Sequence, residues 1–220
     1  RADCAPKEAF DRLVAATDEQ GKTEKAYESV PLSTVSRREE IEKNLPEAPD
    51  FTGDKGIKLE DVANNRATLA GFTAQLEDVE LEALCRGDYV MNSKLGTPGN
   101  AAVYGGILKS LRKKGVPPVS ATDGPSGIRL HCYASLLPIG TLLASTWNQQ
   151  LVRELYAVEG AEMARKGSDV LLAPGMNIHR DPLCGRNFEY FSEDPLLAGT
   201  MGAAVVRGIQ SQGVSACPKH

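Results

Sequence analysis

Residues Gly175–Pro195 read GMNIHRDPLCGRNFEYFSEDP, and this segment is the most informative part of the chain. The apolar run Val170–Ala173 comes before it and a long amphipathic segment comes after it, which indicates a polar loop between a strand and a helix. The loop is dense in His, Arg, Asp, Glu and aromatic residues. Because α/β enzymes place their sites in loops at the carboxyl ends of strands, we expect a functional site here.

The same order of strand, polar loop and helix recurs on either side of this segment. Strands are predicted at Val116–Thr122, Leu142–Ser145, Asp169–Pro174 and Val214–Pro218, and helices at Gln149–Lys166 and Pro195–Gln212. This alternation predicts an α/β fold with a parallel sheet, and the long loops on one side favour a (β/α)8 TIM-type barrel. Four strands do not close such a barrel, so we expect its first half, incomplete as given.

The N-terminal part carries weaker signals. Phe10–Val14 is compatible with one helical turn or with a strand end, and Arg37–Leu45 has the composition of a helix. We interpret residues 1–50 as a linker and the tail of an upstream domain, and residues 51–220 as the N-terminal portion of the barrel. Within that portion, Leu69–Leu84 is predicted to be one amphipathic helix and Met91–Gly106 a loop rich in Gly and Asn.

Composition excludes several classes of function. The 220 residues include 25 basic and 29 acidic side chains mixed along the chain, a formal net charge of −4, which offers no basic stripe for nucleic acid. Five cysteines without a CxxC pair suit reduced thiols better than zinc or disulfides, and they favour a cytoplasmic location. No apolar run reaches the roughly 20 residues that cross a bilayer. We therefore expect no nucleic acid, membrane, metal or cofactor partner.

Polar residues follow the predicted strands at several points. Asp123 begins a DGPSG turn, Arg186 and Glu189 lie in the long loop, and Lys219 and His220 follow the last strand. Carboxylate acceptors together with Arg, Lys and His donors suit the adjacent hydroxyls of a sugar, since each hydroxyl both donates and accepts. A phosphate has no use for Asp123, and a metal requires converging carboxylates or histidines. An Asp that only shapes its turn stays a competing interpretation.

Trp147, the only tryptophan, lies where a strand is predicted to join a helix. Its ring is able to stack on a sugar. Packing in the core is the commoner role of a tryptophan at such a junction, and we favour it here.

Four ordered motifs resemble glycoside hydrolase family 3, in its bacterial β-glucosidase type. They are DGPSGIRL at Asp123–Leu130, STWN at Ser145–Asn148, the block Ala173–Pro195 and PKH at Pro218–His220. The resemblance covers roughly residues 55 to 220. Some members of this type carry an α/β sandwich and a fibronectin-type domain ahead of the barrel, and that reversed order explains residues 1–50 as a remnant of the preceding domain.

The resemblance implies hydrolysis of terminal non-reducing β-D-glucosyl residues with retention of configuration. It implies that Asp123, Arg186, Lys219 and His220 bind the hydroxyls of the terminal sugar, and that Glu189 orients Arg186. It also implies that the nucleophilic Asp lies beyond His220 and that the acid/base Glu belongs to the α/β sandwich domain. Retaining hydrolysis needs two carboxyl groups about 5 Å apart. We expect no catalytic residue within this chain, which alone should be inactive.

Three alternatives stay open at the level of sequence. One is a non-catalytic sugar-binding module with the same polar residues and no nucleophile. Another is β-xylosidase-type specificity. The third is a barrel lyase or aldolase that uses Lys219 as a Schiff-base amine. The sequence leaves the sugar, the linkage and the oligomeric state undetermined, with xylose, galactose and arabinose open beside glucose.

Overall fold

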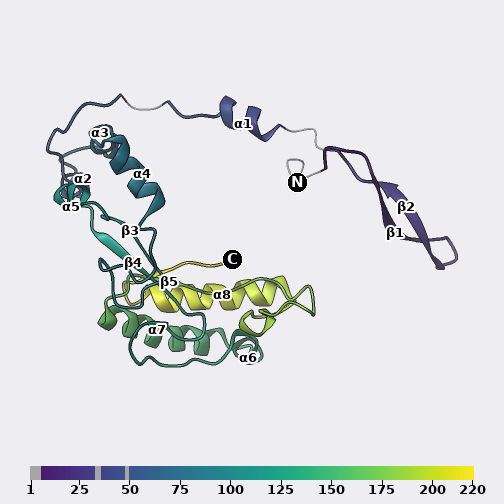
Figure 1. Ribbon diagram of the computed structural model, residues 1–220. Helices are drawn as coiled ribbons and strands as arrows, with labels where there is room; N and C mark the ends of the chain where they lie inside the picture. The colour runs from purple at the N-terminus through teal and green to yellow at the C-terminus, as the bar shows by residue number, and fades with distance from the viewer. Residues whose placement is uncertain (1–5, 33–35, 48–49) are drawn as a thin grey trace. The chain divides into compact units, whose positions relative to one another are not determined.

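The computed structural model describes residues 6–32, 36–47 and 50–220, and the chain divides into two compact units, Arg1–Pro49 and Asp50–His220. We describe each unit by itself (Figure 1). In the described part of the chain, no helix combines the length and the apolar character that a bilayer crossing requires.

The first unit is a β-hairpin followed by a short helix. Strand β1 (Asp11–Thr17) pairs antiparallel with β2 (Thr23–Ser29), and the Asp18 carboxylate accepts backbone hydrogen bonds within the turn between them. Of the two structures that the sequence allowed for residues 10–14, the strand is the one adopted. Helix α1 (Arg37–Lys43) confirms the predicted helix, and Ser36 caps it by accepting a hydrogen bond from Glu39.

The second unit begins with small helices around their own core. They are α2 (Leu59–Ala63), α3 (Leu69–Ala74), α4 (Asp78–Arg86) and α5 (Lys109–Lys113). Phe72, Leu76, Ala83 and Leu111 form the buried cluster between them. The prediction of one helix over 69–84 is wrong, because Glu77 starts a new helix through a capping box with Glu80.

A four-stranded sheet forms the centre of the second unit. It consists of β3 (Ala102–Gly105), β4 (Pro118–Asp123), β5 (Val170–Leu172) and β6 (Ser215–Ala216), in that order. β3 is antiparallel to β4, whereas β4, β5 and β6 are parallel. The prediction of an uninterrupted loop over 91–106 is wrong in its last part, because β4 supplies a ladder of hydrogen bonds that the local Gly-rich composition does not reveal.

Two long helices connect the parallel strands. Helix α7 (Gln149–Lys166) leads from β4 to β5 and α8 (Pro195–Gln210) leads from β5 to β6. They lie side by side in Figure 1, and a Cβ atom on Gly208 of α8 would come within 2.4 Å of the backbone of α7. Asp194 caps α8 by accepting a hydrogen bond from the Leu196 N–H, and Pro195 occupies the first turn. The two βαβ units confirm the α/β class, and the described sheet is open.

The strand predicted at Leu142–Ser145 is wrong, because residues 140–144 form helix α6 (Gly140–Ala144). Short apolar runs do not distinguish strand from buried helix by periodicity. Leu143 and Ala144 face the main core, which also holds Tyr156, Met201 and Ile209. A Cβ atom at Gly140 would lie 2.3 Å from the Glu189 carbonyl oxygen, so α6 packs directly against the loop that carries Arg186 and Glu189.

Candidate functional site

Asp123 and Lys219 meet at the carboxyl ends of the parallel strands. Asp123 is the last residue of β4, and Lys219 follows β6, where its backbone continues the parallel pairing opposite Gly175. The Lys219 Nζ atom donates to Asp123 Oδ1 over 2.6 Å, and the two side chains are 17% and 29% exposed. Arg129 reaches the other oxygen, Oδ2, at 3.3 Å. The carboxylate is therefore held between two cations in a partly buried setting.

The turn after Asp123 requires glycine. Gly124 and Gly127 have φ angles of 153° and 115°, and a Cβ atom on Gly127 would lie 2.3 Å from the Ser135 carbonyl oxygen. Helix α7 holds the turn from the other side, since the Tyr156 hydroxyl donates to the Pro125 carbonyl oxygen over 2.6 Å. The DGPSG turn is thus fixed tightly behind the Asp123 carboxylate.

Arg186 and Glu189 form an ion pair in the long loop. The short 3-10 helix η2 (Asn187–Glu189) brings the Arg186 Nε–H onto Glu189 Oε1. The Glu189 side chain is only 8% exposed, whereas Arg186 is half exposed. This hydrogen bond raises the pKa of Arg186 above its ordinary value. A buried carboxylate therefore orients a guanidinium that is half exposed.

His220 lies beside Tyr190 and Asn177. Its Nδ1 atom is 3.4 Å from the Tyr190 hydroxyl and 3.3 Å from Asn177 Oδ1, and its ring meets the Tyr190 ring edge-on at 5.8 Å. Burial lowers the pKa of His220, and the charges of Arg186 and Lys219 lower it further. Because Nδ1 is engaged by Tyr190 and Asn177, Nε2 is the ring nitrogen that His220 offers to a ligand.

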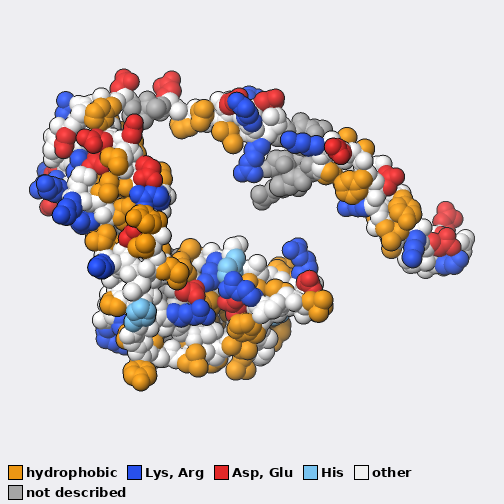
Figure 2. All heavy atoms as spheres, in the orientation of Figure 1, with side chains coloured by type: hydrophobic (Ala, Val, Ile, Leu, Met, Phe, Trp, Pro, Cys, Tyr) orange, Lys and Arg blue, Asp and Glu red, His pale blue; other side chains and the backbone are white. Residues whose placement is uncertain are grey.

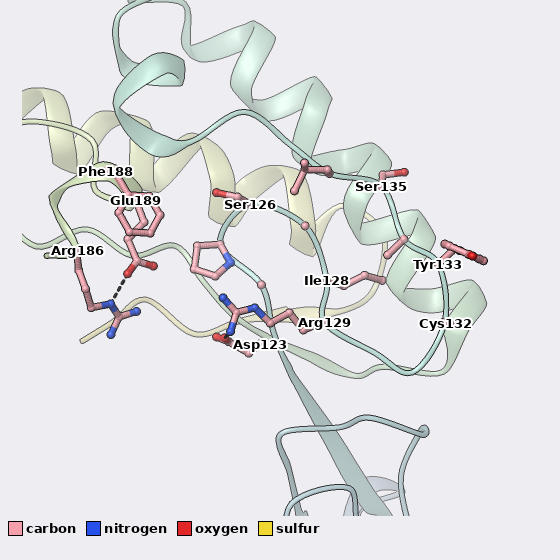
Figure 3. A pocket seen from close by; sticks show the side chains of 15 residues that line it. Asp123, Ser126, Ile128, Arg129, Cys132, Tyr133, Ser135, Arg186, Phe188 and Glu189 are labelled. Atoms are coloured by element: carbon pink, nitrogen blue, oxygen red, sulfur yellow. Dashed lines mark hydrogen bonds and ion pairs between the residues drawn. The ribbon is translucent and has the colours of Figure 1, made fainter.

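A cavity of about 730 Å³ opens over the Asp123 turn. Figure 3 shows Asp123 and Arg129 on one side of it and Arg186 with Glu189 on the other, while Tyr133 and Ser135 lie along a third edge. Lys219 and His220 line a neighbouring cavity with Asn177, of about 340 Å³. Figure 2 shows basic, acidic and His side chains gathered at this C-terminal end of the chain. Volumes of this size suit sugar-sized ligands.

The structure thus brings the five residues selected from sequence to one end of the sheet. Asp123, Arg186 and Glu189 share a cavity, and Lys219 joins Asp123 to the neighbouring cavity that holds His220. Sequence analysis did not select Tyr190 or Asn177, although both lie in the same polar loop. Their contacts with His220 depend on how the loop folds back, which the sequence pattern does not encode.

Two further features are the exposure of Trp147 and the arrangement of the possible metal ligands. Trp147 is 71% exposed, so the favoured interpretation of core packing is wrong for the described chain. The His, Cys, Asp and Glu side chains of the described residues form no group of three or more that is able to hold a metal ion.

The family model of the glycosyl hydrolase family 3 N terminal domain matches residues 99–220. A beta-glucosidase of Ruminococcus albus is 47% identical over 218 residues, which cover 98% of this chain and 22% of that protein. The crystal structure of a beta-glucosidase from Paenibacillus barengoltzii aligns with a TM-score of 0.88 and 49% identity, over 98% of this chain and 24% of the other.

A more distant structure is informative because of its ligand. The beta-glucosidase 3B of Thermotoga neapolitana in complex with glucose aligns with a TM-score of 0.52 and 39% identity, over 64% of this chain and 22% of the other. The present chain spans less than a quarter of the length of each of these relatives. The family model covers more than half of the chain and one relative matches nearly all of it, so the chain belongs to glycosyl hydrolase family 3.

Proposed function

We propose that this chain forms the part of a retaining β-glucosidase that binds the terminal, non-reducing glucosyl residue of its substrate. The observation that carries the proposal is the Asp123–Lys219 contact at the strand ends, beside the cavity that Arg186 and Glu189 line. The relatives are named beta-glucosidases, and one neighbouring structure contains glucose. These names support the choice of glucose over other sugars.

The chemistry of binding follows from the charged groups. Asp123 accepts hydrogen bonds from sugar hydroxyls, while Lys219 and Arg186 donate to hydroxyl oxygens. Hydrogen bonds to charged partners contribute about 1.5–3 kcal/mol each. The sugar ring flattens as it approaches an oxocarbenium-like transition state. Charged hydrogen bonds to its hydroxyls that become shorter in that state stabilise it and accelerate the reaction. We assign the nucleophile and the acid/base to other segments of the full-length protein and no catalytic role to residues of this chain.

The competing Schiff-base function is disfavoured by the same contact. An aldolase or lyase needs a lysine amine that is free to attack a carbonyl. The Lys219 Nζ atom instead lies 2.6 Å from the Asp123 carboxylate, so the amine is engaged in an ion pair and is not free to attack a carbonyl.

The test combines an Asp123→Asn variant of the full-length protein with p-nitrophenyl β-D-glucoside and its 4-deoxy and 6-deoxy analogues. We expect the variant to lose about 10²–10⁴-fold in kcat/KM on the parent glucoside, equivalent to one or two charged hydrogen bonds. On the deoxy analogue that lacks the hydroxyl bound by Asp123, the loss should be much smaller.

An equal loss on all three substrates would show that Asp123 only shapes its turn. Absence of glucoside hydrolysis by the wild-type protein, with sugar binding retained, would favour the non-catalytic sugar-binding module. Faster turnover of the β-xyloside than of the β-glucoside would favour β-xylosidase-type specificity. Leu142→Asn, an exposed substitution on α6 outside the cavity, serves as the matched control.

A further inference from the structure

Trp147 adopts a backbone conformation that is costly for its side chain. Its φ angle is 54°, in the left-handed region, and it is separated from the end of helix α6 by Ser145 and Thr146 and directly precedes the α7 cap residue Asn148. Glycine and asparagine are the residues that commonly adopt this conformation, because a bulky side chain costs about 1–2 kcal/mol there. A tryptophan in this conformation therefore points to a function for the ring that outweighs the backbone cost.

The indole is not used for packing within the described chain. Trp147 is 71% exposed, although the main core lies directly beneath α6 and contains Leu143 and Ala144. Figure 1 shows α6 at the end of the α7–α8 layer. The strain thus presents a large aromatic face outward at the surface of the second unit.

Trp147 borders a cavity of its own. This cavity has a volume of about 270 Å³, and Thr141, Ser145, His179, Phe191 and Glu193 are among its other lining residues. This volume is just below the roughly 300–1,000 Å³ of typical ligand sites, so the cavity has room for no more than about one sugar ring. The segment that carries Phe191 and Glu193 continues directly from Phe188 and Glu189, which line the Asp123 cavity.

One nitrogen of the cavity lining has no hydrogen-bond partner in the described part of the chain, and two oxygen-bearing side chains line the same cavity. The His179 Nε2 atom is buried and has no hydrogen-bond partner among the described residues. A buried unpaired nitrogen is unfavourable and calls for a bound group that satisfies it. The Ser145 hydroxyl donates to the Thr141 carbonyl oxygen, which leaves its own lone pairs free to accept, and Glu193 is exposed.

The groups around this cavity match a carbohydrate ligand. They are an aromatic face, hydroxyls, an imidazole and a carboxylate. The C–H faces of a pyranose ring pack on an indole, and its hydroxyls bond to the polar groups at the edge. We infer that Trp147, His179 and Glu193 form a second carbohydrate-binding site, which takes another glycosyl unit of a β-linked oligosaccharide. The inference rests on the proposed function for the identity of the ligand.

The test uses the full-length protein in the Asp123→Asn background, which disables the first site, with cellotriose as the probe in saturation-transfer NMR. We expect the Asp123→Asn protein to bind cellotriose. We expect the double variant with Trp147→Asn to lose that binding by at least tenfold, and the one with Trp147→Phe to retain it. Leu142→Asn, an exposed apolar substitution on the same helix, should leave binding unchanged.

The melting temperature of the Trp147 variants distinguishes a ligand-binding role of the indole from a packing role. Asparagine tolerates the left-handed conformation, so Trp147→Asn alone should leave the melting temperature unchanged or raise it. A fall of more than about 5 °C, or a failure to fold, would show that another segment of the protein covers the indole, and would overturn the inference. Equal binding with and without Trp147, or no binding by the Asp123→Asn protein, would also overturn it.

The outcomes distinguish this inference from the proposed function. Cellotriose binding that depends on Trp147 in a protein without glucosidase activity would support the second site and reject the enzyme. Glucosidase activity that depends on Asp123, with cellotriose binding indifferent to Trp147, would support the enzyme and reject the second site.

Discussion

The Lys219 ammonium lies 2.6 Å from the Asp123 carboxylate although 96 residues separate the two in sequence. The parallel order of β4, β5 and β6 creates this contact, because it places the carboxyl ends of all three strands at one edge of the sheet. The last residue of β4 and a residue after β6 therefore converge without any local sequence relation.

Asp123 and Lys219 should act as one unit in substrate binding. We expect Asp123→Asn and Lys219→Met each to reduce kcat/KM for p-nitrophenyl β-glucoside by at least 10²-fold in the full-length protein. The loss of kcat/KM in the double variant should be much smaller than the product of the two single losses, because the effects of contacting residues are not additive. The expected coupling free energy is about 1–3 kcal/mol. Multiplicative losses in this double-mutant cycle would show that the two residues act independently.

Glu189 should position Arg186 through their ion pair. Glu189→Gln removes the charge but keeps the shape, so we expect a fall in kcat/KM of about 10–100-fold, the equivalent of a charged hydrogen bond. Glu189→Ala should lose more, since Arg186 then has no anchor. The exposed Glu154 on α7 supplies the matched control, Glu154→Gln, which should behave as wild type. Equal activity of Glu189→Gln and wild type would refute the positioning role.

Glu159 should make stability depend on pH. Glu159 lies on α7 and is 2% exposed. Burial, assisted by the charge of Glu162, raises the pKa of its carboxyl group from 4.5 to about 8, although the backbone N–H of Gly127 acts in the opposite direction. Between these values the folded state holds a proton that the unfolded state has released. The free energy of unfolding should therefore fall by about 1.4 kcal/mol per pH unit from pH 4.5 to 8 and level off above.

Glu159→Gln removes this titration. In urea unfolding of the full-length protein from pH 5 to pH 9, its stability should vary less with pH than that of the wild type, and the variant should be the more stable of the two at pH 7. Parallel pH profiles for the two proteins would mean that Glu159 is ionised in the folded state.

Gly127 should be irreplaceable in the turn behind Asp123. A Cβ atom would meet the Ser135 carbonyl oxygen at 2.3 Å with the backbone at a φ of 115°, so Gly127→Ala should destabilise the protein by about 2 kcal/mol or more. Gly185 has open space around it, and Gly185→Ala should change the stability by no more than about 0.5 kcal/mol. Thermal unfolding of both variants provides the comparison, and similar melting temperatures would contradict the prediction.

The long helices were predictable because their signals are local. Helix α7 carries its apolar face over 18 residues between the Asn148 cap and Gly167, and α8 begins at an Asp-Pro pair. The sequence did not reveal β3, since a four-residue strand in a Gly-rich segment depends on its partner β4. Helix α6 was mistaken for a strand because a five-residue apolar run fits either structure.

The sequence predicts which residues form the candidate site, but it does not predict the contacts among them. Polar residues after strands identified Asp123, Arg186, Lys219 and His220, and the parallel sheet explains why they converge. The contacts of Tyr190 and Asn177 with His220 were missed because they depend on the path of a twenty-residue loop. The exposure of Trp147 was also missed, since a left-handed backbone at a bulky residue has no sequence signature.

The most direct test of the central claim is a crystal structure of the full-length protein soaked with glucose. We predict a glucose molecule in the Asp123 cavity, with its hydroxyls within hydrogen-bond distance of Asp123 Oδ1 or Oδ2, Lys219 Nζ and the Arg186 guanidinium. A glucose bound elsewhere, with the Asp123–Lys219 pair intact and no sugar hydroxyl in contact with either residue, would contradict the claim.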